Sequence, residues 1–319
     1  MGSEMCIRDR RWPEKNSKSS ELEDLKDRVS KSLREADDQN AKDQLTQDTR
    51  LALFREVRGW VPILSCDQDG SRLVQRVIEL VWGREQWELV GELQGKVSEA
   101  VASKHANHVL QRCIEVMPPS AVHFILHELQ SVYSPSDLAK HRYGNRVFQR
   151  MIEHFHPSQL DAFVDGVVEK AQELSTHEFG TFVIQNVIEH GSIHHKRIIS
   201  NMLIANVEQV AIDWHASIVL DKALTYTTFK HDLAKAILDK EGLVVEMAIK
   251  SKHSSKATKR LFEVCEGHDV LENSFKEQVS KRLSDFQESK HGLHLLYSSK
   301  RKKHRTPTLK HYVQDEPLF

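Results

Sequence analysis

One short pattern recurs along the chain at a nearly constant interval, and this regularity restricts the fold more than any other feature of the sequence. The pattern is a small residue, two variable residues, two apolar residues and a polar residue. Its copies begin at Gly70, Ala106, Gly144, Gly180, Ala216, Ser254 and Gly292, and successive copies are 36 or 38 residues apart. Self-similarity at this period is typical of helical repeats that stack in a row. The chain is therefore expected to be a repeat protein.

A second marker indicates a helical element before each copy. Val61, Val97 and Val207 each lie ten residues before the second position of their copy. Each repeat should therefore contain a helical element, a short link and a second helix. The composition agrees, because glycine (13) and proline (8) are scarce and charged residues make up 29% of the chain. The predicted fold class is all-α, an α-solenoid.

The recurring polar residues are expected to share one face of the second helix. On a helical wheel Asn145, Arg146 and Gln149 lie together, whereas the apolar side chains between residues 147 and 152 fill the opposite face. The apolar face must be core, so stacking lines up the polar faces along one side of the solenoid. We call the second, third and sixth residues of each copy its triplet. A row of Asn, Gln, Arg and His is unusual for a surface whose only role is solubility.

Four segments carry a resemblance to a known family. They read DQDGSRLVQRVIE (67–79), KHANHVLQRCIE (104–115), HRYGNRVFQRMIEH (141–154) and HEFGTFVIQNVIEHG (177–191). With them the chain resembles the Pumilio (PUF) family of RNA-binding repeat proteins over about residues 50 to 300. The resemblance implies a curved superhelix of about seven Pumilio-type three-helix repeats. It also implies that each repeat offers its triplet to one base of single-stranded RNA on the concave face.

The resemblance implies a role for each member of the triplet. The first and last residues hydrogen-bond the Watson–Crick edge of a base, and the middle residue stacks between neighbouring bases. Asn and Gln carry the paired donors and acceptors for such an edge, and Arg, His or Phe supply a flat stacking face. The residues expected to contact RNA are Ser71, Arg72, Gln75, Asn107, His108, Gln111, Asn145, Arg146, Gln149, Thr181, Phe182, Gln185, Ser217, Ile218 and Asp221, with Lys256 and Lys259 from the sixth copy.

The family's pairing rules also imply a sequence preference. The pair of edge residues resembles an adenine reader at Ser71/Gln75, a uracil reader at Asn107/Gln111 and Asn145/Gln149, a pyrimidine reader at Thr181/Gln185 and a guanine reader at Ser217/Asp221. Because the family binds RNA antiparallel to the repeats, the expected core is 5′-G-N-U-U-A-3′, where N is a pyrimidine.

The last two copies depart from the pattern. Lys256 and Lys259 are donors without acceptor capacity and suit phosphates better than bases, while Leu293 and Tyr297 cannot make the usual edge contacts. These copies are expected to be capping repeats or non-specific clamps on the RNA backbone. Seven copies against the family's usual eight leave open a missing first repeat.

Two alternative functions compete with base-specific binding. A solenoid of the HEAT or armadillo kind would bind protein partners, and a PUF-like ribosome-biogenesis protein would bind RNA by shape and charge. The second alternative requires basic faces, yet residues 51–250 hold 20 Lys and Arg against 25 Asp and Glu. The triplet pattern therefore favours sequence-specific binding. The resemblance to the family further implies binding to the 3′ untranslated regions of mRNAs, leading to translational repression or decay. Protein corepressors would then bind the convex face of a monomer.

Catalytic and metal-binding motifs are lacking in the sequence. The cysteines Cys6, Cys66, Cys113 and Cys265 have no metal-ligand spacing, and no phosphate loop or nucleophile motif occurs. Six of the 19 histidines lie just before successive repeat helices, and the His194–His195 pair is expected to lie in a loop. The six are His105, His141, His177, His215, His253 and His291. We expect no cofactor, no metal and no enzymatic activity. No apolar stretch reaches the roughly 18 residues of a membrane span. The cytoplasm is the expected location, with the nucleus or nucleolus as alternatives.

The two ends differ from the repeats. Residues 1–48 form a polar leader that is expected to be disordered; Leu22, Leu25, Val29 and Leu33 support a short amphipathic helix as the alternative, and residues 1–10 resemble a cloning artefact. The repeat domain is placed at residues 49–300. Residues 301–319 form a basic and polar tail. The run at residues 300–305 is a nuclear localisation signal, a phosphate contact or a solvated tail.

Overall fold

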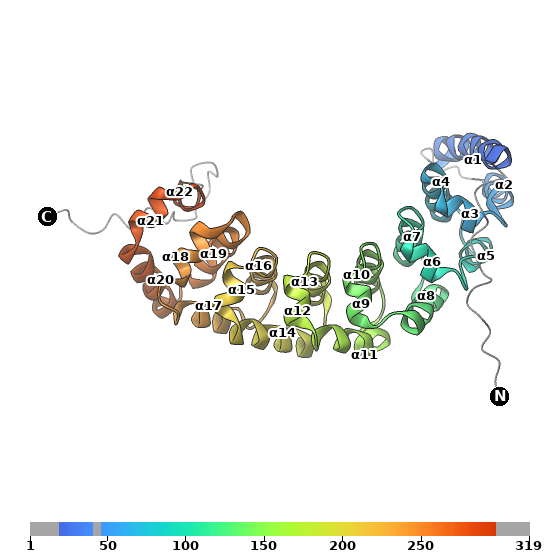
Figure 1. Cartoon of the computed structure of the whole chain (residues 1–319). Helices are drawn as coiled ribbons and strands as arrows, with labels where there is room; N and C mark the ends of the chain where they lie inside the picture. The colour runs from blue at the N-terminus through green and yellow to red at the C-terminus, as the bar shows by residue number, and fades with distance from the viewer. Residues whose placement is uncertain (1–18, 41–45, 298–319) are drawn as a thin grey trace, which may run out of the picture. The chain divides into compact units, whose positions relative to one another are not determined.

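The computed structural model describes residues 19–40 and 46–297, and every regular element in these ranges is an α-helix (Figure 1). Contacts divide the chain into two compact units, residues 1–156 and residues 157–319. Unit 1 holds α1 to α10 and unit 2 holds α11 to α22. The all-α prediction is confirmed.

The helices of unit 1 are α1 Ser19–Asn40, α2 Gln47–Val57, α3 Val61–Cys66, α4 Gln68–Leu80, α5 Arg84–Gly91, α6 Val97–Ala102, α7 Ala106–Val116, α8 Pro119–Val132, α9 Pro135–Lys140 and α10 Gly144–His154. The helices of unit 2 are α11 Pro157–Val168, α12 Ala171–Thr176, α13 Gly180–His190, α14 Ile193–Ala205, α15 Val207–Ile212, α16 Ala216–Tyr226, α17 Lys230–Leu238, α18 Leu243–Lys250, α19 Lys252–Cys265, α20 Asp269–Lys281, α21 Leu283–Glu288 and α22 Lys290–Tyr297.

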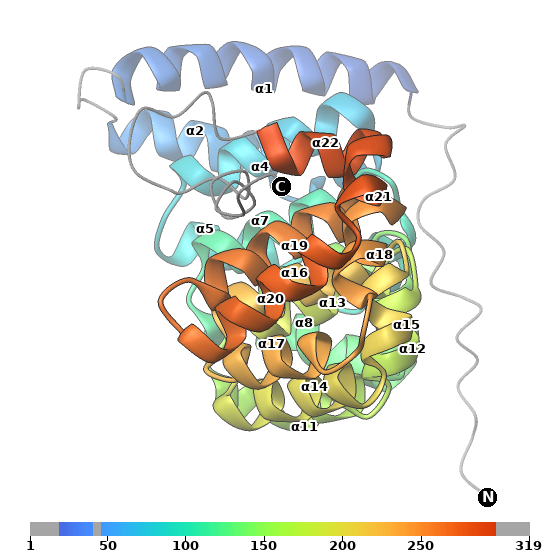
Figure 2. The ribbon, with the colours of Figure 1, turned by 90° about the vertical axis from the view of Figure 1, so that its left-hand side faces the viewer.

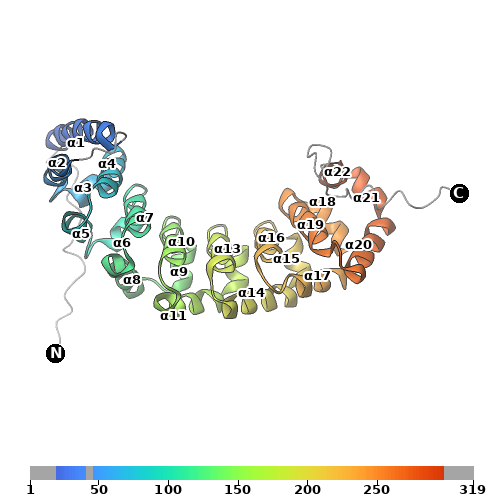
Figure 3. The same cartoon turned by 180° about the vertical axis from the view of Figure 1, so that it is seen from behind.

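Each repeat contains a short helix followed by a longer one that carries the triplet. We call the longer helices, α4, α7, α10, α13, α16, α19 and α22, the core helices. In unit 1, α4 packs on α7 and α7 on α10, while α5 and α8 lie on the opposite side (Figure 3). In unit 2, α13 packs on α16 and α16 on α19. The prediction of about seven helical repeats is confirmed.

The valines that marked the repeat in the sequence begin the short helices. Val61, Val97 and Val207 are the first residues of α3, α6 and α15, and all three are buried. Each packs its apolar side chain into the repeat at the point where the chain turns toward the core helix. The ten-residue interval to the triplet is therefore the length of a short helix and its link.

A repeated carboxylate contact joins neighbouring repeats in unit 1. Oε1 of Glu92 accepts a hydrogen bond of 2.6 Å from the backbone N–H of Gly59, and Oε2 accepts from the N–H of Val61. Glu128 binds the N–H groups of Gly95 and of the residue two farther on in the same way. Both glycines have positive φ angles, 81° and 73°, which other residues rarely adopt. This contact caps a short helix and fixes the step to the next repeat.

The small residue that opens each copy is required by a close approach between helices. A Cβ atom on Gly70 would lie 2.5 Å from the carbonyl oxygen of Leu64, and one on Gly180 would lie 2.8 Å from that of Leu174. Both distances are shorter than van der Waals contact. The short helix therefore packs directly against the start of the core helix, and a large residue at this position would push the two apart.

The start of each core helix is capped by the residue four positions before the triplet. Oδ1 of Asp67 and of Asp213 and Oγ of Ser103 each accept from two backbone N–H groups of the following turn. Nδ1 of His141 and of His177 does the same. These two histidines cap helices, which agrees with the interpretation that the histidines before the repeat helices owe their place to the repeat.

Helix α1 differs from the sequence expectation of a disordered leader. Residues 19–40 form one helix that packs on α2 and α4 in unit 1 (Figure 2). Its side chains Leu25, Val29, Leu33 and Ala36 are buried, at a spacing of four, four and three residues. The amphipathic alternative is therefore the right one for this segment. The polar composition of the segment predicted disorder, although its few apolar residues form a narrow stripe that is buried when α1 packs on α2 and α4. The expectations for residues 1–18 and for the basic tail lie outside the described residues.

Candidate nucleic-acid interface

Every expected contact residue lies on a core helix. The triplets from Ser71 to Gln149 lie on α4, α7 and α10 of unit 1, and those from Thr181 to Lys259 lie on α13, α16 and α19 of unit 2. The first and last members of a triplet are four residues apart, so they lie one above the other on the same helical face. The two units therefore each present a row of three triplets.

The first members are less accessible than the helical wheel suggests. Their exposed fractions are 3% for Ser71, 2% for Asn107, 1% for Asn145, 1% for Thr181 and 0% for Ser217. The expectation of an open polar face does not hold for these five first residues, because each is buried.

The middle members are the most exposed part of the triplets. Arg72, His108, Arg146, Phe182 and Lys256 are exposed, and Ile218 is half-buried. A planar guanidinium, an imidazole and a phenyl ring in these places have the shape required for stacking on a base. The structure therefore separates recessed first residues from protruding middle residues.

The Asn/Gln pairs of α7 and α10 form matching hydrogen-bonded units. Nε2 of Gln111 donates to Oδ1 of Asn107 over 2.8 Å, and Nε2 of Gln149 donates to Oδ1 of Asn145 over 3.0 Å. Each asparagine in turn donates from Nδ2 to a backbone carbonyl at the helix start, over 2.8 Å in both helices. These bonds hold the amide planes in one orientation. They also use amide donors and acceptors inside the protein, which leaves the glutamine Oε1 as the acceptor toward the face.

The glutamines of α4 and α13 are held differently. Nε2 of Gln75 donates to the backbone oxygen of Ser71 over 3.0 Å, and Nε2 of Gln185 donates to that of Thr181 over 3.1 Å. A serine or threonine hydroxyl replaces the second amide here. Each of these pairs therefore presents one amide and one recessed hydroxyl, a different pattern from that of the Asn/Gln pairs.

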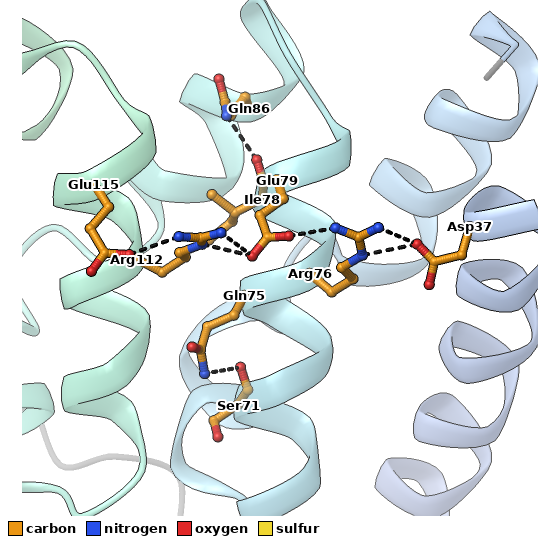
Figure 4. Close-up of polar contacts among 9 residues, drawn as sticks. All are labelled: Asp37, Ser71, Gln75, Arg76, Ile78, Glu79, Gln86, Arg112 and Glu115. Atoms are coloured by element: carbon orange, nitrogen blue, oxygen red, sulfur yellow. Dashed lines mark hydrogen bonds and ion pairs between the residues drawn. The ribbon is translucent and has the colours of Figure 1, made fainter. Parts of the chain in front are cut away.

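A row of alternating charges crosses the core helices of unit 1 next to the triplets (Figure 4). Arg76 contacts Asp37 of α1 and Glu79, and Arg112 contacts Glu79 at 2.6 Å and Glu115 at 2.8 Å. The next arginine, Arg150, continues the row through its own contacts with Glu115 and Glu153. We call this row the charge ladder. The sequence interpretation missed it, although arginine and glutamate recur five and eight residues after the first triplet position.

The Asp221 carboxylate of α16 is ion-paired with the next repeat of unit 2. Its Oδ2 lies 2.7 Å from Nζ of Lys256, and its Oδ1 lies 3.6 Å from Nε of Arg260. The Asp221 side chain is 10% exposed and that of Lys256 is 64% exposed. Two residues expected to contact RNA are thus brought into contact with each other.

His195 departs from its expected place in a loop. It lies in α14 with 3% exposure, and its Nε2 is 2.9 Å from Oδ1 of Asp165. The signal that could have placed it is Ser192, whose hydroxyl caps the helix by accepting from the N–H of His195.

The remaining reactive side chains of the described residues do not assemble into a site. Burial raises the pKa of the Cys113 and Cys265 thiols to about 12, which keeps both protonated at neutral pH. Residues 19–40 and 46–297 hold no cluster of three His, Cys, Asp or Glu side chains able to bind a metal ion. Among the helices in the described part of the chain, none is long and apolar enough to cross a membrane.

Comparison with protein families identifies the repeats. The model of the Pumilio-family RNA binding repeat matches residues 61–89, 103–130, 136–168 and 170–204. These segments contain the core helices α4, α7, α10 and α13.

Curated relatives and solved structures agree with this match. A Pumilio domain-containing protein of Schizosaccharomyces pombe is 28% identical over 186 residues, which cover 57% of this chain and 27% of that protein. Pumilio homolog 12 of Arabidopsis thaliana is 24% identical over 133 residues, 40% of this chain and 22% of its own length. The chain therefore matches about a quarter of the length of these relatives.

The fold is similar to solved structures of Pumilio-type domains. The crystal structure of PUF-8 in complex with PBE-RNA has a TM-score of 0.69 at 23% identity, covering 78% of this chain and 73% of that one. The Puf3 RNA binding domain bound to a Cox17 RNA 3′ UTR recognition sequence has a TM-score of 0.69 at 21% identity, covering 82% of both chains. At these identities the similarity establishes the fold, a Pumilio-type α-solenoid.

Proposed function

We propose that this chain, four of whose repeats match the Pumilio-family RNA binding repeat, binds single-stranded RNA through the triplets of its core helices and distinguishes bases there. The observation that carries the proposal is the pair of matching amide units on α7 and α10. Two successive repeats hold the same two side chains in the same hydrogen-bonded arrangement. A surface with no ligand has no need of such repetition.

The hydrogen-bond geometry supports uracil at α7 and α10. The Oε1 atoms of Gln111 and Gln149 are acceptors suited to the single N3–H donor of uracil. The adjacent asparagine amide can donate to a uracil carbonyl once it turns from its backbone partner. Adenine at α4 is supported by a different pair of side chains, Ser71 and Gln75, in which a smaller hydroxyl replaces one amide. Unit 1 is therefore proposed to select 5′-U-U-A-3′, with α10 binding the 5′ base.

The exposed middle residues support stacking between bases. Arg72, His108 and Arg146 alternate with the edge-binding pairs in unit 1, and Phe182 occupies the same position in α13. Stacking on such side chains stabilises a bound base by about 1–3 kcal/mol regardless of its identity. Affinity would then come largely from the middle residues and selectivity from the edge residues.

The biological role we propose is control of mRNAs through their 3′ untranslated regions, in the cytoplasm. The Puf3 domain described above is bound to such a 3′ UTR sequence, which supports this class of target for the present chain. Repression or decay would require corepressor proteins on the face of the repeats opposite the core helices.

The test is a random-library selection with the full chain at physiological salt, followed by sequencing of the retained RNAs. We expect enrichment of a short motif that contains 5′-U-U-A-3′. Strong retention without any motif would instead favour binding by shape and charge. A chain that retains no RNA would contradict the proposal and favour a protein-binding scaffold.

A further inference from the structure

Asp221 differs from the other third-position residues in what its side chain contacts. The glutamines of α4, α7, α10 and α13 donate to the first residue of their own triplet. A carboxylate has no donor, so Asp221 cannot do so and instead accepts from Lys256 of the next repeat over 2.7 Å. Its other oxygen, Oδ1, is buried and accepts no hydrogen bond. Both oxygens of the residue expected to read guanine therefore face positive charge or protein.

The charge ladder explains why this contact forms here. In α7 and α10 the ladder arginine pairs with the glutamate eight residues after the preceding triplet begins: Arg112 with Glu79 and Arg150 with Glu115. The corresponding position on α16 is Thr225, which cannot form an ion pair. Arg260 of α19, the ladder arginine of that repeat, is left with Glu263 of its own helix and with Asp221, at 3.6 Å. Asp221 thus replaces the missing ladder acid.

Lys256 adds a second positive charge to the same carboxylate. It is the middle member of the α19 triplet, the position that stacks or contacts the RNA backbone in the proposed function. Its Nζ is 2.7 Å from Oδ2 of Asp221, while its side chain is 64% exposed. The donor edge of guanine, N1–H and N2–H, would have to displace this ammonium group before it could reach Oδ2.

We infer that Lys256 determines specificity at the α16 repeat: it occupies the acceptor atom of Asp221 and prevents this repeat from selecting guanine. This inference rests on the proposed RNA-binding function and revises only the base at α16. Because Lys256 is largely exposed, it acts as a removable competitor. The wild-type chain accepts any base at this position, and removal of the lysine side chain reveals the guanine preference that the Ser217/Asp221 pair implies.

The experiment measures dissociation constants of the full chain for four RNAs that differ only at X in 5′-XUUUA-3′, by fluorescence anisotropy at physiological salt. The readout is the ratio of the dissociation constants for the other three RNAs to that for the guanine RNA. A general loss of phosphate contacts changes all four constants equally and leaves this ratio unaltered. For wild type we expect nearly equal affinities. For Lys256→Ala we expect the guanine ratio to rise by about fivefold, the equivalent of one partly exposed ion pair.

Two further variants separate this effect from a structural one. Lys252→Ala removes an exposed lysine of the same helix that lies outside the triplet, and it should leave the ratio unchanged. The double change Lys256→Ala with Asp221→Asn should abolish the new preference, because an amide cannot accept from both guanine donors. An unchanged ratio in Lys256→Ala overturns the inference while tight binding of the UUA-containing RNAs preserves the proposed function. If wild type binds none of the four RNAs, both are overturned.

Discussion

The helix cap at His141 links the protonation of one residue to the stability of a repeat. Nδ1 of His141 accepts from the N–H groups of Tyr143 and Gly144, over 3.3 and 2.8 Å. A protonated Nδ1 cannot accept a hydrogen bond. Desolvation by burial, to which the packed Tyr133 ring contributes, lowers the pKa of His141 below 6.5. The neutral form is therefore the folded form of this cap.

The sign of the pH dependence follows from this lowered pKa. Above about pH 6.5 the cap contributes fully to the free energy of unfolding, and the contribution is lost as the pH falls through the folded pKa. His141→Ser keeps a capping acceptor that does not titrate. When the pH falls from 7.5 to 5, we expect its free energy of unfolding to decrease by about 1 kcal/mol less than that of wild type. Urea unfolding at both pH values measures the difference. His108→Gln, at an exposed position, is the control, and identical pH dependence of wild type and His141→Ser would exclude the cap as the cause.

The edge residues of α7 provide the sharpest test of base reading. Replacing Asn107 by Ser and Gln111 by Glu converts the uracil pair into the pair that resembles a guanine reader. We expect the preference at this base to move from uracil to guanine by about tenfold, the effect of one hydrogen bond to a charged group. Competition binding with two RNAs that differ at this base measures the change. An unaltered preference for uracil would contradict reading by this pair.

The sequence located the triplets but not their exposure. The wheel of one helix placed Asn145, Arg146 and Gln149 on the same face correctly, because that depends only on the helical period. It could not show that Asn145 is 1% exposed, since the helical period of one helix carries no information on how the folded chain covers a side chain. The Lys256–Asp221 contact joins residues 35 positions apart. Because they lie in different repeats, an analysis of one repeat at a time could not predict it.

At the scale of helices, the charge ladder joins successive core helices of unit 1 by ion pairs. Glu79 receives Arg76 of its own helix and Arg112 of the next, and its side chain is 23% exposed. Partial burial makes such a contact more stabilising than a fully solvated ion pair. The ladder is therefore expected to help set the alignment of successive core helices.

Removing the shared acid tests this role. We expect Glu79→Gln to lower the free energy of unfolding by about 1 kcal/mol, because two arginines lose their common partner. Arg72→Gln is the matched control, since Arg72 pairs with Asp69 at 3.7 Å and both side chains are largely exposed. Chemical denaturation measures both variants. Equal stability of Glu79→Gln and wild type would show that the ladder is only a surface feature.

Helix α1 marks the limit of sequence interpretation at this scale. The repeats could be recognised in the sequence by their period, whereas α1 occurs once and has no second copy for comparison. Its Asp37 extends the ladder to Arg76, a role visible only after α1 is packed on α4. The mean composition of residues 11–48 indicated disorder because a stripe of four apolar residues is small beside many charged ones.

At the scale of the whole molecule, the charge balance restricts how RNA can be held. The full chain has a formal net charge of −1, so bulk electrostatic attraction cannot be the main source of affinity. The cations of the triplets are Arg72, Arg146, Lys256 and Lys259. If each contacts one phosphate, the plot of log affinity against log salt should have a slope of about −3.

Binding measured between 50 and 300 mM salt tests this expectation. A slope near −3 would agree with the triplet cations as the phosphate contacts. A much steeper slope would assign further contacts to the basic run at residues 300–305, which lies outside the described residues. Deleting residues 300–319 would then restore the shallow slope, and its failure to do so would exclude the tail.

The packing of α1 on α4 affects how copies of this chain can associate with one another in solution. A stack of repeats is an open-ended polymer in principle, because an uncovered terminal helix offers the same apolar stripe that its internal counterparts bury. Helix α1 packs on α4 and buries its own Val29 and Leu33, whereas Asp24, Asp27, Lys31 and Arg34 of α1 are exposed to water. Docking of another copy on this face of α1 would therefore require burying charged side chains.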